Sequence, residues 1–254
     1  MPKKTSRTVE AVQKTCRILD EIQEQGEIRV TELADQVEYS KSTVHGHLAT
    51  LVDEGLVVKT NQKYRLSLNF LDIAESVKNR VTDHEIVREQ VRKLADETGE
   101  VVHFAAEEDG NVVYIAKSQG DEAVQTESKI GKSMPMHSTS LGKAMLAEFD
   151  RDRVDQIIEQ RGLPSRTPTT LTTPEALHEE LEETTERGYS IDNEENIPGV
   201  RCIGIAVSVS EYGVVGALSI SGPSQRMTDD RIKNELQEKI AQAANVIEVN
   251  SMYA

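Results

Sequence analysis

The chain has 254 residues, of which 37% are hydrophobic, and a formal net charge of −15 at pH 7. It contains no run of about 18 apolar residues, so no membrane span is expected, and its basic start lacks the apolar core of a secretory signal. We therefore expect a cytoplasmic protein with room for one large domain or two ordinary ones. Its two cysteines, Cys16 and Cys202, have no metal-ligand spacing and are expected to be reduced thiols.

The negative charge is concentrated after residue 80. Residues 1–80 contain 12 Lys and Arg and 12 Asp and Glu, and residues 81–254 contain 17 and 32, which accounts for the net charge of −15. The N-terminal part can therefore approach a polyanion. Dense carboxylates favour a salt-loving host, where a Debye length of about 3 Å at molar salt screens distant repulsion. An acidic sensing domain in an ordinary cell would have the same composition.

The chain begins with a basic arm of Lys3, Lys4 and Arg7, which is either a phosphate or minor-groove contact or a disordered tail. A helix is predicted over residues 8–25, and Gly26 ends it. Its apolar stripe consists of Val12, Cys16, Leu19 and Ile22. This stripe places Cys16 in the core as a small apolar residue. Residues 28–30 are expected to pair with a later hairpin.

Two short helices follow, separated by a tight turn. Thr31 is the predicted N-cap of the first helix, whose apolar residues are Leu33, Ala34 and Val37. Ser40 is the predicted N-cap of the second, and Gly55 is expected in a left-handed conformation after its end. The second helix has apolar residues at helical spacing, namely Val44, Leu48, Leu51 and Val52. The order of parts is that of a helix-turn-helix.

A basic-tipped hairpin is predicted behind the second helix, with strands at 56–58 and 64–66. A recognition helix followed by such a hairpin is typical of a winged helix-turn-helix that binds DNA, although a helical core with an incidental hairpin would read similarly. Short polar or basic side chains on the outer face suit a major groove about 12 Å wide. The predicted DNA contacts are Thr31, Ser40, Lys41, Ser42, Thr43, His45, Gly46, Thr50, Lys59, Lys63 and Arg65.

Residues 1–67 are therefore expected to form the DNA-binding domain. Residues 68–82 have apolar residues at helical spacing and are expected to form a linker helix, and a second amphipathic helix is predicted near 83–98. Two apolar stripes after a DNA-binding domain favour packing on a partner in a dimer, while packing within the chain is the alternative.

Residues 83–254 are expected to form the second domain, with a mostly antiparallel sheet in an α+β fold. Strand patterns occur at 101–106, 112–116, 123–130, 202–210 and 214–221, and helices are predicted at about 139–147, 151–160, 174–187 and 228–249. The charged residues 179–186 are expected to form a solvated helix face.

No motif in this second domain carries a strong catalytic prediction. Ser140 and Lys143 match the S-x-x-K pattern of acyl-serine enzymes, but the accompanying S-D-N and K-T-G elements are missing. We expect residues 138–140 instead to cap a helix whose N-terminus suits an anion. A zinc site that combines Cys202 with a histidine remains an alternative, but no metal or other cofactor is expected. The acidic residues Asp192, Glu194 and Glu195 are either a ligand site or a wet surface.

Several separated motifs, in order, resemble those of the IclR family of transcriptional regulators over nearly the whole chain. They are 64–66 at the exit of the winged helix-turn-helix, 135–147 at the helix start, Gly188-Tyr189 with Asp192 and Glu195, 199–202, and 217–223. The resemblance implies a winged helix-turn-helix, a linker helix and a GAF-like effector-binding domain. It also implies a regulator rather than an enzyme.

The resemblance further implies a small carboxylic, keto or sugar-derived acid as effector, and a homodimer or homotetramer on a pseudo-palindromic operator. The implied ligand-binding residues are Ser140, Leu141, Asp192, Cys202, Ser219 and Ser221. Relatives in salt-loving archaea resemble regulators of sugar catabolism. The alternative function is a metabolite-sensing module that acts through protein partners instead of DNA.

Overall fold

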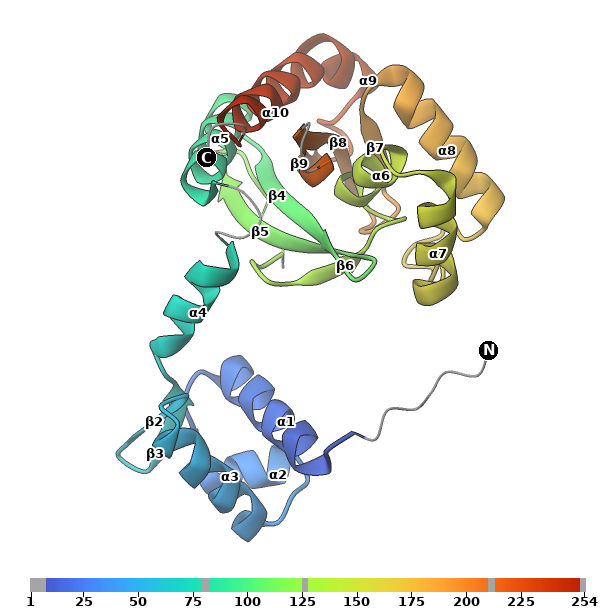
Figure 1. Cartoon of the computed structure of the whole chain (residues 1–254). Coiled ribbons are helices and arrows are strands. Elements are labelled where there is room, and N and C mark those ends of the chain that lie inside the picture. The colour runs from blue at the N-terminus through green and yellow to red at the C-terminus, as the bar shows by residue number, and fades with distance from the viewer. Residues whose placement is uncertain (1–7, 79–82, 125–127, 210–212, 252–254) are drawn as a thin grey trace. The chain divides into compact units, whose positions relative to one another are not determined.

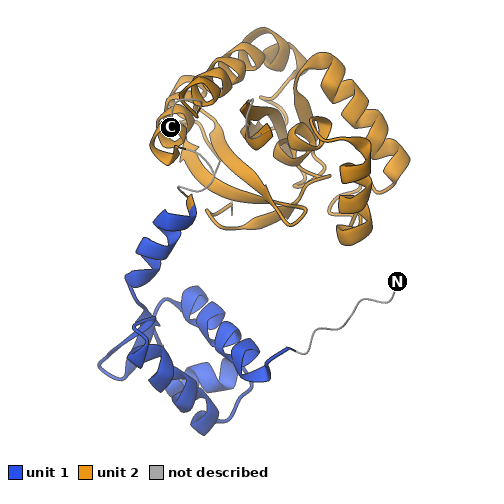
Figure 2. Ribbon diagram, viewed as in Figure 1, with its two compact units in different colours: residues 1–77 blue, residues 78–254 orange. Residues whose placement is uncertain are grey.

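The computed structural model describes residues 8–78, 83–124, 128–209 and 213–251. The chain divides into two compact units, residues 1–77 and 78–254 (Figure 2). None of the helices in the described residues is both long and apolar enough to cross a bilayer.

The first unit is a small helical domain with a three-stranded antiparallel sheet in the order β1-β3-β2. Three helices, α1, α2 and α3, pack around one core, and the strands close it (Figure 1). The core is made chiefly of Ile18, Ile22, Leu33, Val44, Leu48 and Leu51. The elements are α1 (Glu10–Gln25), β1 (Ile28–Arg29), α2 (Val30–Gln36), α3 (Lys41–Asp53), β2 (Val57–Thr60), β3 (Lys63–Leu66) and α4 (Asn69–Lys78).

The predicted helix-turn-helix and hairpin are confirmed. Ser40 caps α3 by accepting a hydrogen bond from the Thr43 amide, and Gly55 has φ +72° after the helix. β1 pairs with β3 as expected. The two-residue turn between β2 and β3 places Asn61 and Gln62 at φ +47° and +66°, the backbone of a tight hairpin.

Three details of the first unit differ from the sequence prediction. The buried side of α1 is centred on Ile18 and Ile22, so that Val12 and Cys16 are exposed. Helix α2 begins two residues earlier than expected, because Glu32 accepts a hydrogen bond from the Arg29 amide and fixes Arg29 as the cap. Thr31 therefore lies inside the first turn and is not the N-cap. Val52 is 36% exposed and contributes little to the core.

The second unit is a three-layer domain around a six-stranded antiparallel sheet, ordered β6-β5-β4-β9-β8-β7. Helices α5 and α10 cover one face, and α6, α7 and α8 lie over the other (Figure 1). Alternate residues of a strand serve the two cores: Phe104 packs beneath α5 and α10, and Ala105 faces the α6 side. The elements are α5 (His84–Thr98), β4 (Val101–Glu108), β5 (Asn111–Gln119), β6 (Ser133–Pro135), α6 (Ser140–Ala147), α7 (Arg151–Arg161), α8 (Pro174–Arg187), β7 (Ser190–Asn193), β8 (Val200–Val209), β9 (Gly213–Pro223), α9 (Asp229–Arg231), the π-helical turn Ile232–Leu236 and α10 (Gln237–Ser251).

The mostly antiparallel α+β domain is confirmed, but one predicted strand is wrong and one strand was missed. No strand forms among the described residues of 123–130, while 125–127 lie outside the described residues. The strand instead comes later, at β6, where Ser133 and Met134 pair with Val113 and Val112 of β5. Strand β7 was missed altogether, because it is only four residues long and lies at the sheet edge.

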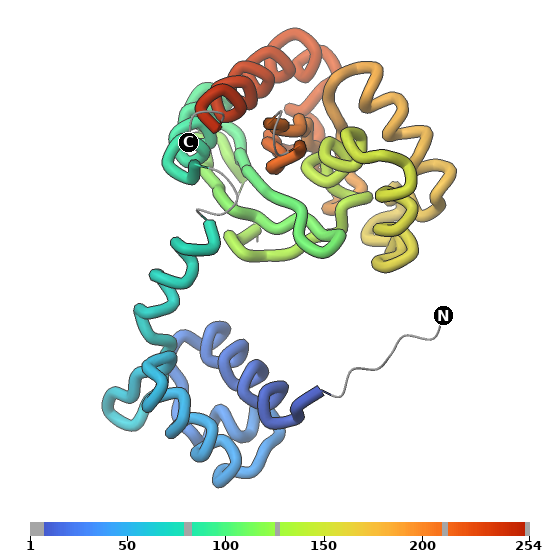
Figure 3. The backbone as a smooth tube through the Cα atoms, viewed as in Figure 1, coloured from blue at the N-terminus to red at the C-terminus, as the bar shows by residue number. Residues whose placement is uncertain are grey.

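The C-terminal helix begins where it was predicted, near residue 228, and is capped by Thr228, whose hydroxyl accepts a hydrogen bond from the Arg231 amide. It is interrupted by one π-helical turn before α10, which lies along α5 in the backbone trace (Figure 3). Buried Ile232, Leu236 and Ile240 keep the whole segment against the sheet.

Candidate functional site

The outer face of α3 presents five of the eleven predicted DNA contacts to solvent. Lys41, Ser42, His45, Gly46 and Thr50 are exposed, and Thr43 is half-buried. Burial of Val44, Leu48 and Leu51 on the opposite side of the same helix causes this separation. His47, two residues after His45, faces inward instead, with Nδ1 2.8 Å from the Thr15 hydroxyl.

Hydroxyl groups cluster at the N-terminus of α3. The Ser40 Oγ lies 2.9 Å from Ser42 Oγ and 2.8 Å from Thr43 Oγ1, in addition to capping the helix. The cluster orients three of the predicted contacts together. It also means that replacing Ser40 alters both the helix start and its neighbours.

The cations of the hairpin differ in their surroundings. Lys59 is exposed and lies over the Tyr64 ring, 5.4 Å from its centroid. Lys63 is 3.7 Å from the Glu27 carboxylate, and the Arg65 guanidinium donates to the Leu66 carbonyl. Thr31 is exposed on the first turn of α2. Lys59 is therefore the most available of the three hairpin cations.

The six predicted ligand residues come together around one small cavity in the second unit. Asp192 of β7 is paired with Cys202 of β8, which is paired in turn with Ser221 of β9. Ser219 lies two residues from Ser221 and therefore on the same face of β9. Ser140 and Leu141 supply the first turn of α6 opposite these strands, and the cavity has a volume of about 40 Å³.

Close packing brings α6 down onto the sheet. A Cβ at Gly204 of β8 would lie 2.6 Å from the Ser140 carbonyl oxygen, so only glycine permits this approach. The Ser190 hydroxyl donates to the same carbonyl at 2.6 Å. The start of α6 is thus held at a defined height above β8, with Thr139 as its N-cap.

The polar groups of the cavity are largely uncharged. Burial, aided by the neighbouring Glu195 carboxylate, raises the pKa of Asp192 to about 7. Oδ1 of Asp192 accepts from the Glu195 amide at 2.8 Å, and the Cys202 thiol lies 3.8 Å from Oδ2. Burial also raises the pKa of the Cys202 thiol, so this group is a neutral hydrogen-bonding group and not a thiolate nucleophile.

Two further lining residues, His103 and Tyr114, were not predicted. Their rings lie 4.7 Å apart, and His103 Nε2 is 2.8 Å from the Ser128 hydroxyl. Burial lowers the pKa of His103 to about 3, so the imidazole is neutral. His103 is paired with Ser219 across the β4–β9 ladder. The sequence indicated both strands, but only this pairing shows that His103 belongs to the cavity.

The S-x-x-K pair does not form an acyl-serine arrangement. Lys143 is fully buried and binds two carboxylates, Glu195 at 2.6 Å and Glu180 at 3.3 Å. No hydrogen bond joins it to the Ser140 hydroxyl within the described residues. Glu180 was expected on a solvated face and is instead largely covered, because it pairs with Lys143 and also with Arg187 at 2.6 Å.

The acidic segment at residues 192–195 is not a wet surface, because Asp192 and Glu195 are both buried. In the part of the chain that the structure describes, no group of three or more His, Cys, Asp or Glu residues is arranged to hold a metal ion. The cavity therefore offers hydroxyls, a thiol, one carboxyl group and the first turn of a helix.

Residues 11–60 match the family model for the IclR helix-turn-helix domain, and residues 78–249 match that for the C-terminal region of the bacterial transcriptional regulator IclR. The chain belongs to the IclR family. It is thus a DNA-binding transcriptional regulator with an effector-binding domain, and not an enzyme.

Similar proteins cover almost the whole chain. The regulator KdgR of Escherichia coli is 37% identical over 92% of this chain and 88% of its own length. The crystal structure of IclR from Thermotoga maritima matches with a TM-score of 0.82 and 28% identity, over 94% of this chain and 97% of that one. An IclR homologue from Microbacterium hydrocarbonoxydans, solved with 4-hydroxybenzoate, has the same fold at 21% identity and a TM-score of 0.81, over 96% of this chain and all of that one.

Proposed function

We propose that this IclR-family protein binds a pseudo-palindromic operator as a homodimer or homotetramer. A short-chain carboxylic or keto acid would raise or lower its affinity for that operator. The observation that carries the proposal is the convergence of all six predicted ligand residues on one cavity. We expect the regulated genes to serve carbohydrate catabolism, and the protein to act in the cytoplasm of a salt-loving host.

The chemistry of the cavity supports an acid as effector. The first-turn amides of α6 favour a negative group, and the Ser219 and Ser221 hydroxyls can donate to carboxylate or keto oxygens. Asp192 can remain protonated near neutrality and donate as well. The related 4-hydroxybenzoate complex also contains a carboxylic acid.

The size of the cavity supports a small acid. A cavity that holds benzene has a volume of about 150 Å³, and the cavity here has about 40 Å³. An acid of a few heavy atoms, such as glyoxylate or pyruvate, is therefore a better probe than an aromatic acid.

On DNA, we assign base contacts to the exposed face of α3 and backbone contacts to the hairpin. Lys41, Ser42, His45 and Thr50 would contact base edges, and Thr43 and Gly46 would lie where the α3 backbone comes closest to the DNA. Lys59, Lys63 and Arg65 would hold phosphates, as would Ser40 and Thr31 at helix starts. In a dimer, the two copies of α3 must match half-sites about 34 Å apart or a multiple of it.

The linker connects sensing to binding in this proposal. Helix α4 has no buried residue within its own unit, and Leu71, Ile73 and Val77 are exposed. Packing of two linkers in a dimer would cover these side chains. An effector that favours one arrangement of the dimer would change the spacing of the two α3 helices and thereby the affinity for the operator.

The decisive experiment measures fluorescence anisotropy of labelled DNA from upstream of the protein's own gene. It is done at the ionic strength of the host, with random duplex as competitor, and with and without glyoxylate and pyruvate. The proposal requires a preference for the upstream duplex and a shift with at least one acid. A protein without any duplex preference would act through protein partners instead.

A further inference from the structure

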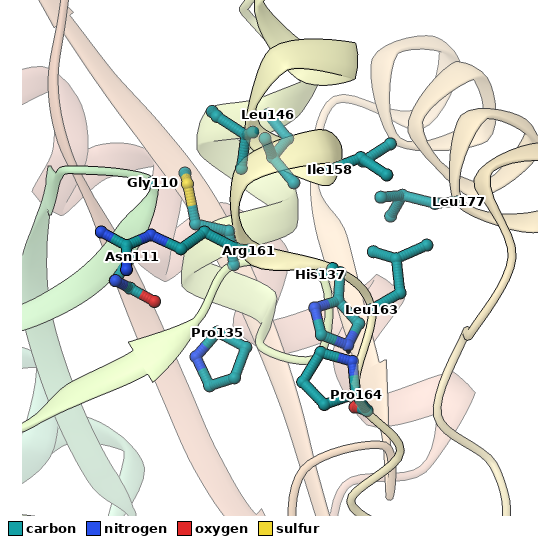
Figure 4. A pocket seen from close by; sticks show the side chains of 13 residues that line it. Gly110, Asn111, Pro135, His137, Leu146, Ile158, Arg161, Leu163, Pro164 and Leu177 are labelled. Atoms are coloured by element: carbon teal, nitrogen blue, oxygen red, sulfur yellow. Dashed lines mark hydrogen bonds between the residues drawn. The ribbon is translucent and has the colours of Figure 1, made fainter. Parts of the chain in front are cut away.

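A second and larger cavity lies in the same unit beside the small cavity lined by Asp192, Cys202 and Ser219, which we call the effector cavity after its proposed role. It has a volume of about 250 Å³ and is bounded by α7, the loop that follows it, the tip of the β4–β5 hairpin and the approach to α6 (Figure 4). None of the residues that line it also lines the effector cavity. Nothing assigned to the protein above uses this space.

The walls of the second cavity are mainly apolar. Leu146, Ile157, Ile158, Leu163 and Leu177 contribute aliphatic side chains, and two prolines contribute ring faces. At about 150 Å³ an apolar cavity holds benzene, so a volume of about 250 Å³ accommodates a ring with a small substituent. The body of a ligand in this cavity would therefore be aromatic or branched aliphatic.

One end of the cavity carries a guanidinium that is paired with an exposed carboxylate. Figure 4 shows the Arg161 guanidinium beside the Asn111 amide group. Nε of Arg161 donates to the Asp109 carbonyl and Nη2 pairs with the Asp109 carboxylate, while Nη1 makes no hydrogen bond to the described residues. Asp109 is 79% exposed, and exposed ion pairs are worth only about 0–1 kcal/mol. An incoming anion can therefore share this guanidinium at little cost.

The other polar wall cannot hold an anion. His137 is 3% exposed, and its Nε2 donates to the Pro164 carbonyl at 3.1 Å. Burial lowers the pKa of His137, so the ring is neutral and its Nδ1 is an acceptor. A carboxylate would be repelled by this lone pair. The negative group of a ligand must therefore point to Arg161 and its apolar body toward the leucines and isoleucines.

We propose that this second cavity binds a monocarboxylic acid with an aromatic or branched aliphatic body, the carboxylate on Arg161 and Asn111. The site is separate from the effector cavity and has the opposite preference for ligand size. It goes beyond the proposed function and does not depend on it.

The two cavities share one piece of backbone. Met136 and His137 line the second cavity, and Thr139 and Ser140 line the effector cavity. The turn between them is packed hard against α6, because a Cβ on Gly142 would lie 2.2 Å from the Met136 carbonyl oxygen. A ligand that shifts this turn would also shift the start of α6, so binding at one cavity is expected to alter affinity at the other.

The test is ¹⁹F NMR of 4-fluorobenzoate with the full-length protein, and 4-fluorobenzyl alcohol serves as the uncharged analogue. We expect millimolar or tighter binding of the acid and weaker binding of the alcohol. Arg161→Met keeps the stem that packs on Gly110 but removes the charge, and should raise the dissociation constant for the acid about tenfold. Arg151→Met on the same helix, where the cation is exposed and does not line the cavity, is the matched control and should leave it unchanged.

Two further variants locate the bound probe. Ile158→Trp fills the second cavity and should abolish binding, whereas Ser219→Val in the effector cavity should leave it intact. Arg161 is on the surface, so its variant tests the charge even where Ile158→Trp does not fold. No binding of the acid at millimolar concentration, equal binding to the Arg161→Met variant, or loss of binding in Ser219→Val alone would each overturn the proposal.

Discussion

Asp192 and Cys202 face each other across the β7–β8 ladder, with Sγ of Cys202 3.8 Å from Oδ2 of Asp192. The thiol of Cys202 carries no positive charge that could stabilise an ionised Asp192 carboxylate. A carboxyl group beside a buried thiol is most stable when it carries its proton, since burial penalises its ionised form. The protonation state of Asp192 can therefore be used to test whether this cavity binds an acid.

The affinity for a short acid should fall as the pH rises. With the pKa of Asp192 at about 7, its carboxylate would repel an anionic ligand above neutrality, and the dissociation constant for glyoxylate or pyruvate should increase about tenfold between pH 6 and 8. Calorimetric titration across this range measures the effect. In Asp192→Asn the pH dependence should flatten; an equally steep dependence in that variant would exclude Asp192 as its source.

The same carboxyl group should make folding stability depend on pH. Its pKa in the folded state, about 7, is above the value of 3.8 expected in the unfolded chain. The folded state therefore retains a proton that the unfolded state loses, and its contribution to the free energy of unfolding is complete below about pH 4 and declines as the pH rises to about 7. Urea unfolding of wild type and Asp192→Asn at pH 5 and 7.5 should show the wild type losing more stability than the variant. A smaller loss in the wild type would contradict the raised pKa.

Replacing Lys143 should be far more damaging than replacing a surface lysine. Lys143→Met would leave the buried Glu195 carboxylate without its cation, a change that typically costs about 3–5 kcal/mol. The double variant Lys143→Met with Glu195→Gln should recover part of this loss. Lys93→Met, whose amine is 3.9 Å from Glu97 on the exposed face of α5, is the matched control in urea unfolding.

His45 and His47 should separate DNA recognition from stability. His45 is exposed on α3, so His45→Ala should lower the preference for the operator over other duplexes by about 1–3 kcal/mol if the ring contacts a base, with little change in thermal stability. His47→Ala removes the contact with Thr15 and should lower the melting temperature instead. A reversed pattern would show that the outer face of α3 is not the reading surface.

Lys59 is proposed to contact a phosphate, so its contribution to DNA affinity should depend on the salt concentration. Lys59→Ala is expected to weaken binding to all duplexes alike and to reduce the slope of log affinity against log salt by about 1. Because Lys59 is exposed over the Tyr64 ring, we expect the variant to keep its fold, and circular dichroism checks this. An unchanged slope would remove Lys59 from the set of phosphate contacts.

The two cysteines should differ sharply in reactivity. Cys16 is exposed on α1, while Cys202 is buried and has a raised pKa. Ellman's reagent should therefore modify one thiol rapidly and the second only on unfolding, and Cys16→Ser should abolish the rapid phase. Slow reaction of both thiols in the native protein would mean that a partner covers α1 in solution.

The sequence by itself determined the local elements of this protein and their order. Ser40 caps α3, and the spacing of Val44, Leu48 and Leu51 sets its buried side, because N-caps and helical periodicity depend on neighbours within a few residues. The hairpin that follows α3 and the start of the C-terminal helix at Thr228 are local in the same sense. The family could also be recognised from the sequence, because each of its motifs is a short run of residues and the motifs occur in the same order along the chain.

Only the tertiary structure decided which faces and which distant residues meet. The predicted stripe of Val12, Cys16, Leu19 and Ile22 is apolar enough to be a core, but packing against α2 and α3 turned the buried side of α1 toward Ile18, so that Val12 and Cys16 are exposed. The residues from 123 to 130 have strand-like composition, yet the open edge of β5 is paired by Ser133–Pro135. Lys143 and Glu195 are 52 positions apart, and a buried ion pair over that distance has no signature in local spacing. The long-range pairing of strands and the burial of charge, which depend on the whole chain, placed both cavities.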